Sequence, residues 1–251
     1  MELSTVINYL NDLLQPQLFR DYCPNGLQVQ GNSTIKTLVT GVSASQALIE
    51  AAIELQADAL LVHHGFFWKN ESPSIVGMKY RRIKALLLNE INLLAYHLPL
   101  DAHPLYGNNI QLGQLLGLEN IETFEVEPGL NLGYKGRLPR ALSGELFSEL
   151  IARKLLRTPL HIESNDRSIE TVAWCTGGAQ DYLSQAIDQN IDAYLTGEVS
   201  ERTFHLAKEN NIHFYAAGHH ATERYGVKAL GEHLSQKFNL IHHFVDIDNP
   251  V

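Results

Sequence analysis

The sequence predicts an α/β fold made of two similar lobes, each with a mainly parallel or mixed β-sheet. Short apolar runs typical of buried strands alternate with longer segments of helical periodicity along most of the 251 residues. Residues 37–64 also align without gaps with residues 171–198, and Asp58 and Asp192 are among the identical pairs. We interpret this repeat as an internal duplication, with shared α/β patterning as the alternative explanation.

The elements of the first half follow in order from these patterns. Residues 3–14 place apolar side chains on one helical face, and Ser4 could cap that helix. A strand at 37–43, a helix at 44–56 and a strand at 59–64 have the order of a right-handed crossover. The other predicted elements are strands at 27–30 and 92–97 and helices at 79–90 and 107–117.

The second half continues the alternation. Residues 133–162 predict a strand, a helix capped near Ser143 and another strand, and further strands and helices fill residues 169–247. We expect a first lobe at residues 1–127, and a connecting segment with the second lobe at residues 128–251.

A ligand cleft is expected between the two lobes, where the carboxyl ends of their strands would converge. Open α/β sheets bind ligands outside the carboxyl ends of their strands. His63 and His64 occupy such an end in the first lobe, and Glu198 holds the matching position in the second.

Composition excludes several classes of protein. The chain has only Cys23 and Cys175, which is too few for a disulfide framework or a thiolate metal site. The net charge of −9 argues against a broad basic surface for nucleic acid or anionic lipid. No apolar run approaches the roughly 18 residues of a membrane span, and the first residues lack the pattern of a secretory signal, so a cytoplasmic location is expected.

The adjacent pair His63 and His64 ends an apolar run and precedes Gly65. Neighbouring side chains on a strand point to opposite faces, so two adjacent imidazoles are poorly placed to chelate one ion. If Gly65 starts a turn, the rings can splay while staying close, and each can bind its own metal. The ordinary alternative is one packed, hydrogen-bonded histidine beside a solvated one.

Three further ligand candidates follow strands. Asp101 lies just beyond the strand at 92–97, and Pro99 is expected to keep the intervening segment extended. His219 and Glu223 follow Gly218 and, four residues apart, would share one face of a helix. A capping aspartate and an ordinary helix pair are the alternatives. Gathered in one cleft without a cation, these groups would bring together repelling carboxylates and desolvated polar atoms.

Six short motifs in this order carry a family resemblance that covers nearly the whole chain. The chain resembles the NIF-three-like family, whose bacterial members are called GTP cyclohydrolase 1 type 2 homologues. The motifs are "NGLQV" at 25–29, "HHG" at 63–65, "LPLDAHPLYGNN" at 98–109, "GRLPRALS" at 136–143, "TGE" at 196–198 and "GHHATER" at 218–224.

The resemblance implies a dinuclear centre in two related α/β lobes and a ring-shaped homohexamer. Some members insert an extra domain between the lobes, and the short connection here predicts that it is missing. The residues implied as ligands of two divalent ions per subunit are His63, His64, Asp101, His219 and Glu223.

These features predict a metal-dependent hydrolase that acts on a nucleotide-like or other small phosphorylated substrate. His97, four residues before Asp101, is a candidate for proton transfer or for a hydrogen bond that supports a ligand, and an ordinary hydrogen-bonded histidine is the alternative. The amides of the Gly177–Gly178 turn could hold a phosphate, or the turn could be only a tight connection. Imidazole and carboxylate ligands suit Zn, Mn, Fe, Co or Ni. A noncatalytic metal-binding or regulatory scaffold is the alternative function.

Overall fold

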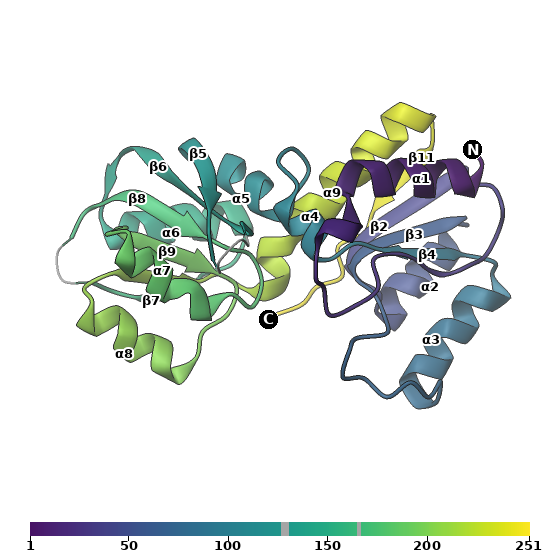
Figure 1. Ribbon diagram of the computed structural model, residues 1–251, viewed down its shortest axis with the longest axis horizontal. Helices are drawn as coiled ribbons and strands as arrows, with labels where there is room; N and C mark the ends of the chain where they lie inside the picture. The colour runs from purple at the N-terminus through teal and green to yellow at the C-terminus, as the bar shows by residue number, and fades with distance from the viewer. Residues whose placement is uncertain (127–130, 165–166) are drawn as a thin grey trace. The chain divides into compact units, whose positions relative to one another are not determined.

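The chain forms two compact units, each built around its own β-sheet (Figure 1). The computed structural model describes residues 1–126, 131–164 and 167–251. Unit 1 comprises Met1–Gly107 and Gly226–Asp248, and unit 2 comprises Asn108–Tyr225 and Asn249–Val251. The predicted lobe boundary between residues 127 and 128 lies outside the described residues.

Unit 1 contains a five-stranded sheet in the order β1-β4-β3-β2-β11. Only the edge strand β1 runs antiparallel to its neighbour, so this sheet is mainly parallel, as predicted. The strands are β1 (Gly26–Val29), β2 (Thr37–Ser43), β3 (Ala59–His64), β4 (Asn92–Ala95) and β11 (Ile241–Phe244).

Helices cover both faces of this sheet (Figure 1). Ala59 and Leu61 of β3 pack in the core under α1 and the later turns of α9, whereas Leu60 and Val62 pack in the core under α2 and α3. A strand buried on both faces reads as a continuous apolar run, which is why "ALLV" contains no polar residue. The helices are α1 (Leu3–Leu14), α2 (Gln46–Glu54), α3 (Gly77–Leu88) and α9 (His219–Phe238), with the 3-10 turn η1 (Pro16–Leu18) after α1.

Unit 2 contains a six-stranded mixed sheet in the order β5-β6-β8-β9-β10-β7. Strands β8, β9 and β10 are parallel, and the remaining pairs are antiparallel. The strands are β5 (Glu119–Phe124), β6 (Gly133–Leu142), β7 (Leu160–Ile162), β8 (Ile169–Trp174), β9 (Ala193–Thr196) and β10 (His213–Ala216). The helices are α5 (Asn108–Leu116), α6 (Gly144–Leu155), α7 (Leu183–Asp188) and α8 (Glu201–Glu209), with the 3-10 turn η2 (Gln180–Tyr182) before α7.

The two units repeat one local structure at the start of their first parallel strand. Asp58 and Asp192 each precede the second parallel strand of their sheet and accept two backbone N–H groups at the start of the first. Asp58 Oδ2 accepts from Lys36 and Thr37 at 2.8 Å each, and Asp192 Oδ2 accepts from Glu170 at 3.1 Å and Thr171 at 2.9 Å. The internal duplication stays a prediction, which this correspondence supports.

Of the two helix caps predicted from the sequence, the structure confirms one and not the other. The Ser143 hydroxyl accepts the N–H of Leu146 at 3.2 Å and caps α6, as predicted. Ser4, however, lies inside α1, whose N-cap is Glu2. Among the described residues, no helix combines the length and the apolar character needed to cross a membrane.

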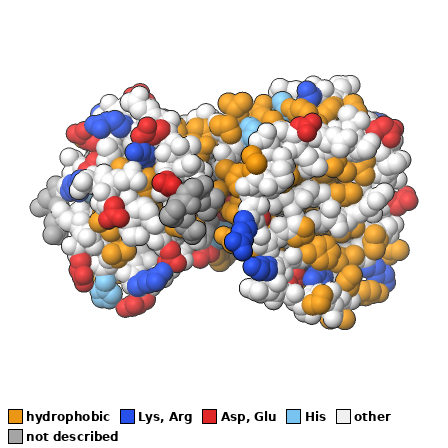
Figure 2. Space-filling view, viewed as in Figure 1, with side chains coloured by type: hydrophobic (Ala, Val, Ile, Leu, Met, Phe, Trp, Pro, Cys, Tyr) orange, Lys and Arg blue, Asp and Glu red, His pale blue; other side chains and the backbone are white. Residues whose placement is uncertain are grey.

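Charged side chains are dispersed over the visible surface. On the face shown in Figure 2, Lys and Arg side chains lie scattered among Asp and Glu on each unit. This distribution agrees with the expectation, from the net charge of −9, that no broad basic surface is present on that face.

Candidate metal centre

His63 and His64 stand at the carboxyl end of β3 with their rings close together. The ring centroids are 4.5 Å apart and the ring planes are inclined by 42°. His63 is fully buried, and its Nδ1 donates to the carbonyl of Tyr96 at 3.0 Å. Because a carbonyl can only accept, Nδ1 of His63 carries a proton, and in the neutral ring Nε2 then has the lone pair. His64 Nδ1 shares a hydrogen bond of 3.0 Å with the Ser43 hydroxyl.

Asp101 reaches His63 from a short helix. The segment around Pro99 forms α4 (Leu98–Ala102), so the prediction of an extended segment was wrong. Proline is compatible with the first turn of a helix, where the missing N–H has no intrahelical acceptor. Asp101 Oδ1 lies 3.4 Å from His63 Nε2. The carboxylate and the nitrogen lone pair attract only when a proton or a cation lies between them.

Gly65 is needed for close packing after the two histidines. The Phe66 N–H donates to Gln28 Oε1 at 2.7 Å, which fixes the Gln28 side chain over the turn. A Cβ at Gly65 would lie 2.2 Å from Gln28 Oε1 and 2.6 Å from the Cβ of Ala95. The glycine of "HHG" and the glutamine of "NGLQV" therefore form one packed unit.

In unit 2, His219 and Glu223 form the predicted pair on the first turns of α9. Gly218 precedes this helix with a φ of +98°, and His219 Nε2 lies 3.2 Å from Glu223 Oε2. His219 Nδ1 lies 2.7 Å from Glu198 Oε1. Burial opposes a charge on His219, but the two carboxylates outweigh it and raise the pKa of His219 to about 9. The two carboxylates therefore favour a positive charge at this position.

The Gly177–Gly178 turn lies directly against this pair. A Cβ at Gly177 would lie 2.1 Å from Glu223 Oε1 and 3.1 Å from His219 Nε2. The Gly177 N–H donates to the Thr222 hydroxyl at 3.1 Å. The turn is thus a tight connection, and phosphate binding by its amides stays a prediction.

His97 lies beside the two strand-end histidines. Its ring centroid is 5.0 Å from that of His63 and 5.7 Å from that of His64, and one nitrogen from each ring lies within 4.8 Å of the other two. Its Nδ1 lies 2.8 Å from Asp21 Oδ1. Burial raises the pKa of Asp21, but the hydrogen bond and charge of His97 and the hydrogen bond from Asn25 outweigh it and lower the pKa to about 2.

Cys23 lies beside Asp21 and His97, a placement that the sequence did not indicate. Its Sγ is 4.0 Å from Asp21 Oδ1, and Asp21, Cys23 and His97 form a second group whose ligand atoms lie within 4.8 Å of one another. Burial, and then the charge of Asp21, raise the pKa of the Cys23 thiol to about 12. Cys23 is therefore a neutral thiol at physiological pH unless a metal replaces its proton.

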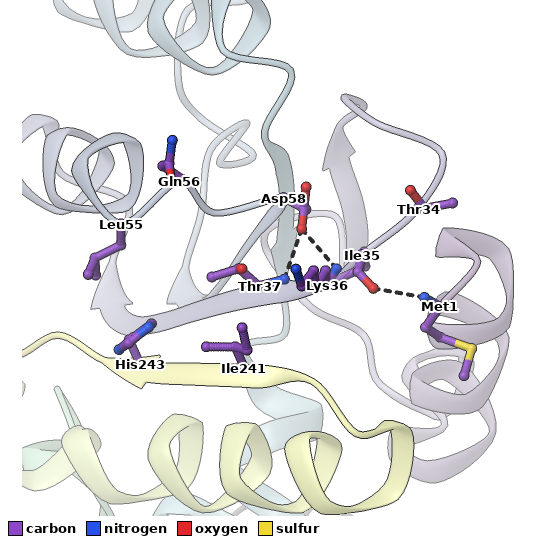
Figure 3. Close-up of a pocket in the computed structure, with 10 residues that line it drawn as sticks. All are labelled: Met1, Thr34, Ile35, Lys36, Thr37, Leu55, Gln56, Asp58, Ile241 and His243. Carbon is purple, nitrogen blue, oxygen red and sulfur yellow. Dashed lines mark hydrogen bonds between the residues drawn. The ribbon is translucent and has the colours of Figure 1, made fainter.

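A separate cavity of about 680 Å³ lies in unit 1, near the amino ends of β2 and β11 (Figure 3). Thr37 and Ile241, the first residues of these strands, line it, and Asp58 lies there with its carboxylate bound to the amides of Lys36 and Thr37. This is the opposite end of the strands from His63 and His64, so the cavity contains none of the candidate metal ligands of unit 1.

Comparison with known proteins decides the family. The sequence profile of the family described as Duf34/NIF3 (NGG1p interacting factor 3) matches residues 1–250. This chain belongs to the Duf34/NIF3 family. The resemblance seen in the sequence motifs is thereby confirmed, and the two sheets of this α/β fold are those of a NIF3 protein.

Relatives from several bacteria carry the name GTP cyclohydrolase 1 type 2 homolog. The one from Vibrio cholerae is 56% identical over 244 residues, which cover 96% of each chain. The one from Pseudomonas aeruginosa is 51% identical over 248 residues, covering 99% of this chain and 98% of the relative. The solved structure of the protein ybgI has a TM-score of 0.95 and 48% identity, and the match covers both chains completely.

The candidate residues of this NIF3 chain have the donor chemistry that divalent metals require. His63, His64 and His219 each place Nδ1 against an oxygen, supplied by Tyr96, Ser43 and Glu198 respectively. Histidines that bind metals usually hold the other ring nitrogen in such a hydrogen bond, which sets the tautomer and the ring orientation. In each of the three histidines, Nε2 is thus the nitrogen that could bind a metal. Asp101 lies beside His63 in unit 1, and Glu223 lies beside His219 in unit 2.

Some of these supporting residues were missed by reasoning from sequence. Glu198 appeared only as the counterpart of the histidine pair in the internal alignment, without a role. Asp21 and Ser43 belong to no short chemical motif, so nothing in the sequence marked them. Their roles depend on contacts between segments far apart in the chain.

Proposed function

We propose that this protein is a dinuclear divalent-metal hydrolase that acts on a nucleotide-like or other small phosphorylated substrate. The observation that carries the proposal is the shared arrangement of His63, His64 and His219, each with Nδ1 against an oxygen. A carboxylate oxygen lies 3.4 Å from Nε2 of His63 and 3.2 Å from Nε2 of His219, where a shared cation would bind both atoms.

The proposed ligands come in two sets. Unit 1 supplies His63, His64 and Asp101, and unit 2 supplies His219 and Glu223. Zinc sites have about four ligands per ion, so neither set alone provides enough protein donors for two ions. We propose that both sets bind the same pair of ions, with one of the adjacent histidines on each ion.

When bound, two such ions would lower the pKa of a water molecule and polarise the electrophilic group of the substrate. The chain's own residues then have distinct tasks. Asp101 and Glu223 would balance the positive charge of the ions. His97 would accept a proton at Nε2 from the attacking water, because its Nδ1 is already engaged with Asp21.

The relatives' name selects the first substrates to test. GTP cyclohydrolase 1 type 2 homolog is the name of those proteins, and for this chain it places guanine nucleotides at the head of a panel that also includes other nucleotides and phosphoesters. The ligand types are compatible with Zn, Mn, Fe, Co or Ni, so each metal is loaded separately.

The decisive experiment is substrate profiling of protein whose metal content has been measured, beside a His64→Ala variant. We expect at least one substrate to be turned over at a rate that scales with metal content and falls at least about 100-fold in His64→Ala, because a lost ligand should cost no less than a lost supporting hydrogen bond. A fully metallated protein that turns over nothing in the panel would favour the noncatalytic scaffold instead.

A further inference from the structure

We propose that Asp21 is a positioning residue that holds His97 as the Nδ1–H tautomer and so leaves Nε2 as its proton-accepting atom. The inference deepens the proposed hydrolase function and rests on it for its catalytic meaning. It concerns residues of unit 1 only.

Four N–H donors hold the Asp21 carboxylate, and its side chain is only 3% exposed. Oδ1 accepts the N–H of Tyr22 at 2.7 Å and lies 2.8 Å from His97 Nδ1. Oδ2 accepts from Asn25 Nδ2 at 2.9 Å and from the N–H of Leu98 at 3.0 Å. The carboxylate therefore has little freedom to turn away from His97.

The backbone of His97 is fixed by the same loop. Asn25 Oδ1 accepts the His97 N–H at 2.7 Å, while Asn25 Nδ2 donates to Asp21. Asn25 is the first residue of the "NGLQV" motif, and these two hydrogen bonds give its side chain a structural role. The ring and the main chain of His97 are thus set by two side chains that lie four residues apart.

An ionised carboxylate determines which ring nitrogen of His97 carries the proton. Because it can only accept, its partner at 2.8 Å must be Nδ1–H. The opposite tautomer would point the Nδ1 lone pair at a negative charge. Nε2 is then the nitrogen with a lone pair, in a ring 5.0 Å from that of His63. Asp21 would also stabilise the imidazolium formed when Nε2 takes up a proton, as carboxylates paired with catalytic histidines do.

The competing explanation is that the hydrogen bonds of Asp21 only stabilise the loop. It predicts that Asp21→Asn lowers stability without changing the proton on the His97 ring. The positioning role predicts a change of tautomer, because the amide of asparagine can donate to Nδ1 where the carboxylate could not.

The test is ¹⁵N solid-state NMR of the full-length, zinc-loaded protein with labelled histidine, at alkaline pH. Its chemical shifts distinguish protonated from unprotonated ring nitrogens, and a His97→Gln spectrum assigns the signals. In the wild type, we expect His97 to be protonated at Nδ1 and not at Nε2. In Asp21→Asn, we expect the Nδ1–H tautomer to be no longer the dominant form. Asp58→Asn is the matched control, since that carboxylate also accepts backbone amides in unit 1, and it should retain the wild-type pattern.

A wild-type ring protonated at Nε2 alone would overturn the proposal, and so would a wild-type pattern in Asp21→Asn. If Asp21→Asn fails to fold, the wild-type spectrum alone decides the tautomer. Turnover is not part of the measurement, so the absence of any substrate would count against the hydrolase and leave the tautomer result intact.

Discussion

Gly177 brings the backbone into contact with the His219–Glu223 pair, and only the absence of a side chain permits this approach. Its φ is +70°, so an L side chain would also be strained there. Gly117, in the same unit, has a similar φ of +74° but nothing within 4 Å of a Cβ built on it. Comparing alanine substitutions at the two glycines therefore distinguishes the free-energy cost of backbone strain from the cost of displacing the candidate ligands.

We predict that Gly177→Ala disturbs the metal centre and that Gly117→Ala does not. Both substitutions should lose about 1 kcal/mol of unfolding free energy from strain at positive φ. Gly177→Ala should lose at least a further ~1 kcal/mol, because Glu223 Oε1 must move from a point 2.1 Å from the new Cβ. Urea denaturation and bound-metal measurements on both variants check this. Equal stability and equal metal content in the two variants would show that the close contact is unimportant.

Sequence reasoning found the candidate ligands but not the residues that orient them. His63, His64 and Asp101 were identifiable because polar groups directly after buried strands gather at one edge of a parallel sheet. Asp21 lies 76 positions before His97 in the chain, and no local pattern connects them. Tertiary contacts of this kind become visible only when the fold is known.

Two aspartates, Asp58 and Asp192, perform the same task at the start of β2 and of β8. Each carboxylate accepts two backbone N–H groups where a parallel strand begins. These amides lie at the strand start, where the sheet alone does not satisfy them. The predicted internal duplication would explain why the residue type and the contact recur together.

We predict that Asp58→Ala and Asp192→Ala each lower the unfolding free energy by about 1–3 kcal/mol, because each leaves two amides without their acceptor. Urea denaturation at neutral pH measures this loss. Glu50→Ala, which removes an exposed carboxylate from α2, is the control and should change stability by less than about 0.5 kcal/mol. Losses as small as the control's would contradict a capping role.

The contribution of Asp192 should also depend on pH. Burial acts to raise its pKa, but hydrogen bonds from Thr171 and Glu170 and the charge of Arg167 outweigh burial, so the folded-state pKa lies below the ordinary 3.8. The stabilisation is therefore present above pH 3.8 and is lost as the pH falls below it. The difference between wild type and Asp192→Ala should shrink over that range.

Most strands were predictable from sequence, and the exceptions have physical reasons. Strands β2 and β3 are buried on both faces and read as apolar runs. Strand β5, which was not predicted, is largely exposed in Glu119–Phe124 and carries polar side chains. Helix α4 was misjudged because Pro99 disfavours a helix at the preceding residue but is accepted within a first turn.

At the scale of the whole molecule, the two units carry complementary shares of the proposed donor set. The three proposed ligands of unit 1 lie at the carboxyl end of β3 and in α4, and the two proposed ligands of unit 2 lie in the first turns of α9. Metal ions that bind the folded chain and not the unfolded chain would stabilise it by mass action. The homohexameric ring implied by the family resemblance stays a prediction.

The central claim is that both units contribute ligands to one dinuclear centre, and metal content per chain tests it most directly. Wild type should bind two divalent ions per chain after loading and desalting. His64→Ala in unit 1 and Glu223→Gln in unit 2 should each lower that number, whereas His205→Ala, an exposed histidine paired with Glu201 on α8, should retain both ions. Two ions retained in either ligand variant, or a wild-type chain that binds none, would contradict the claim.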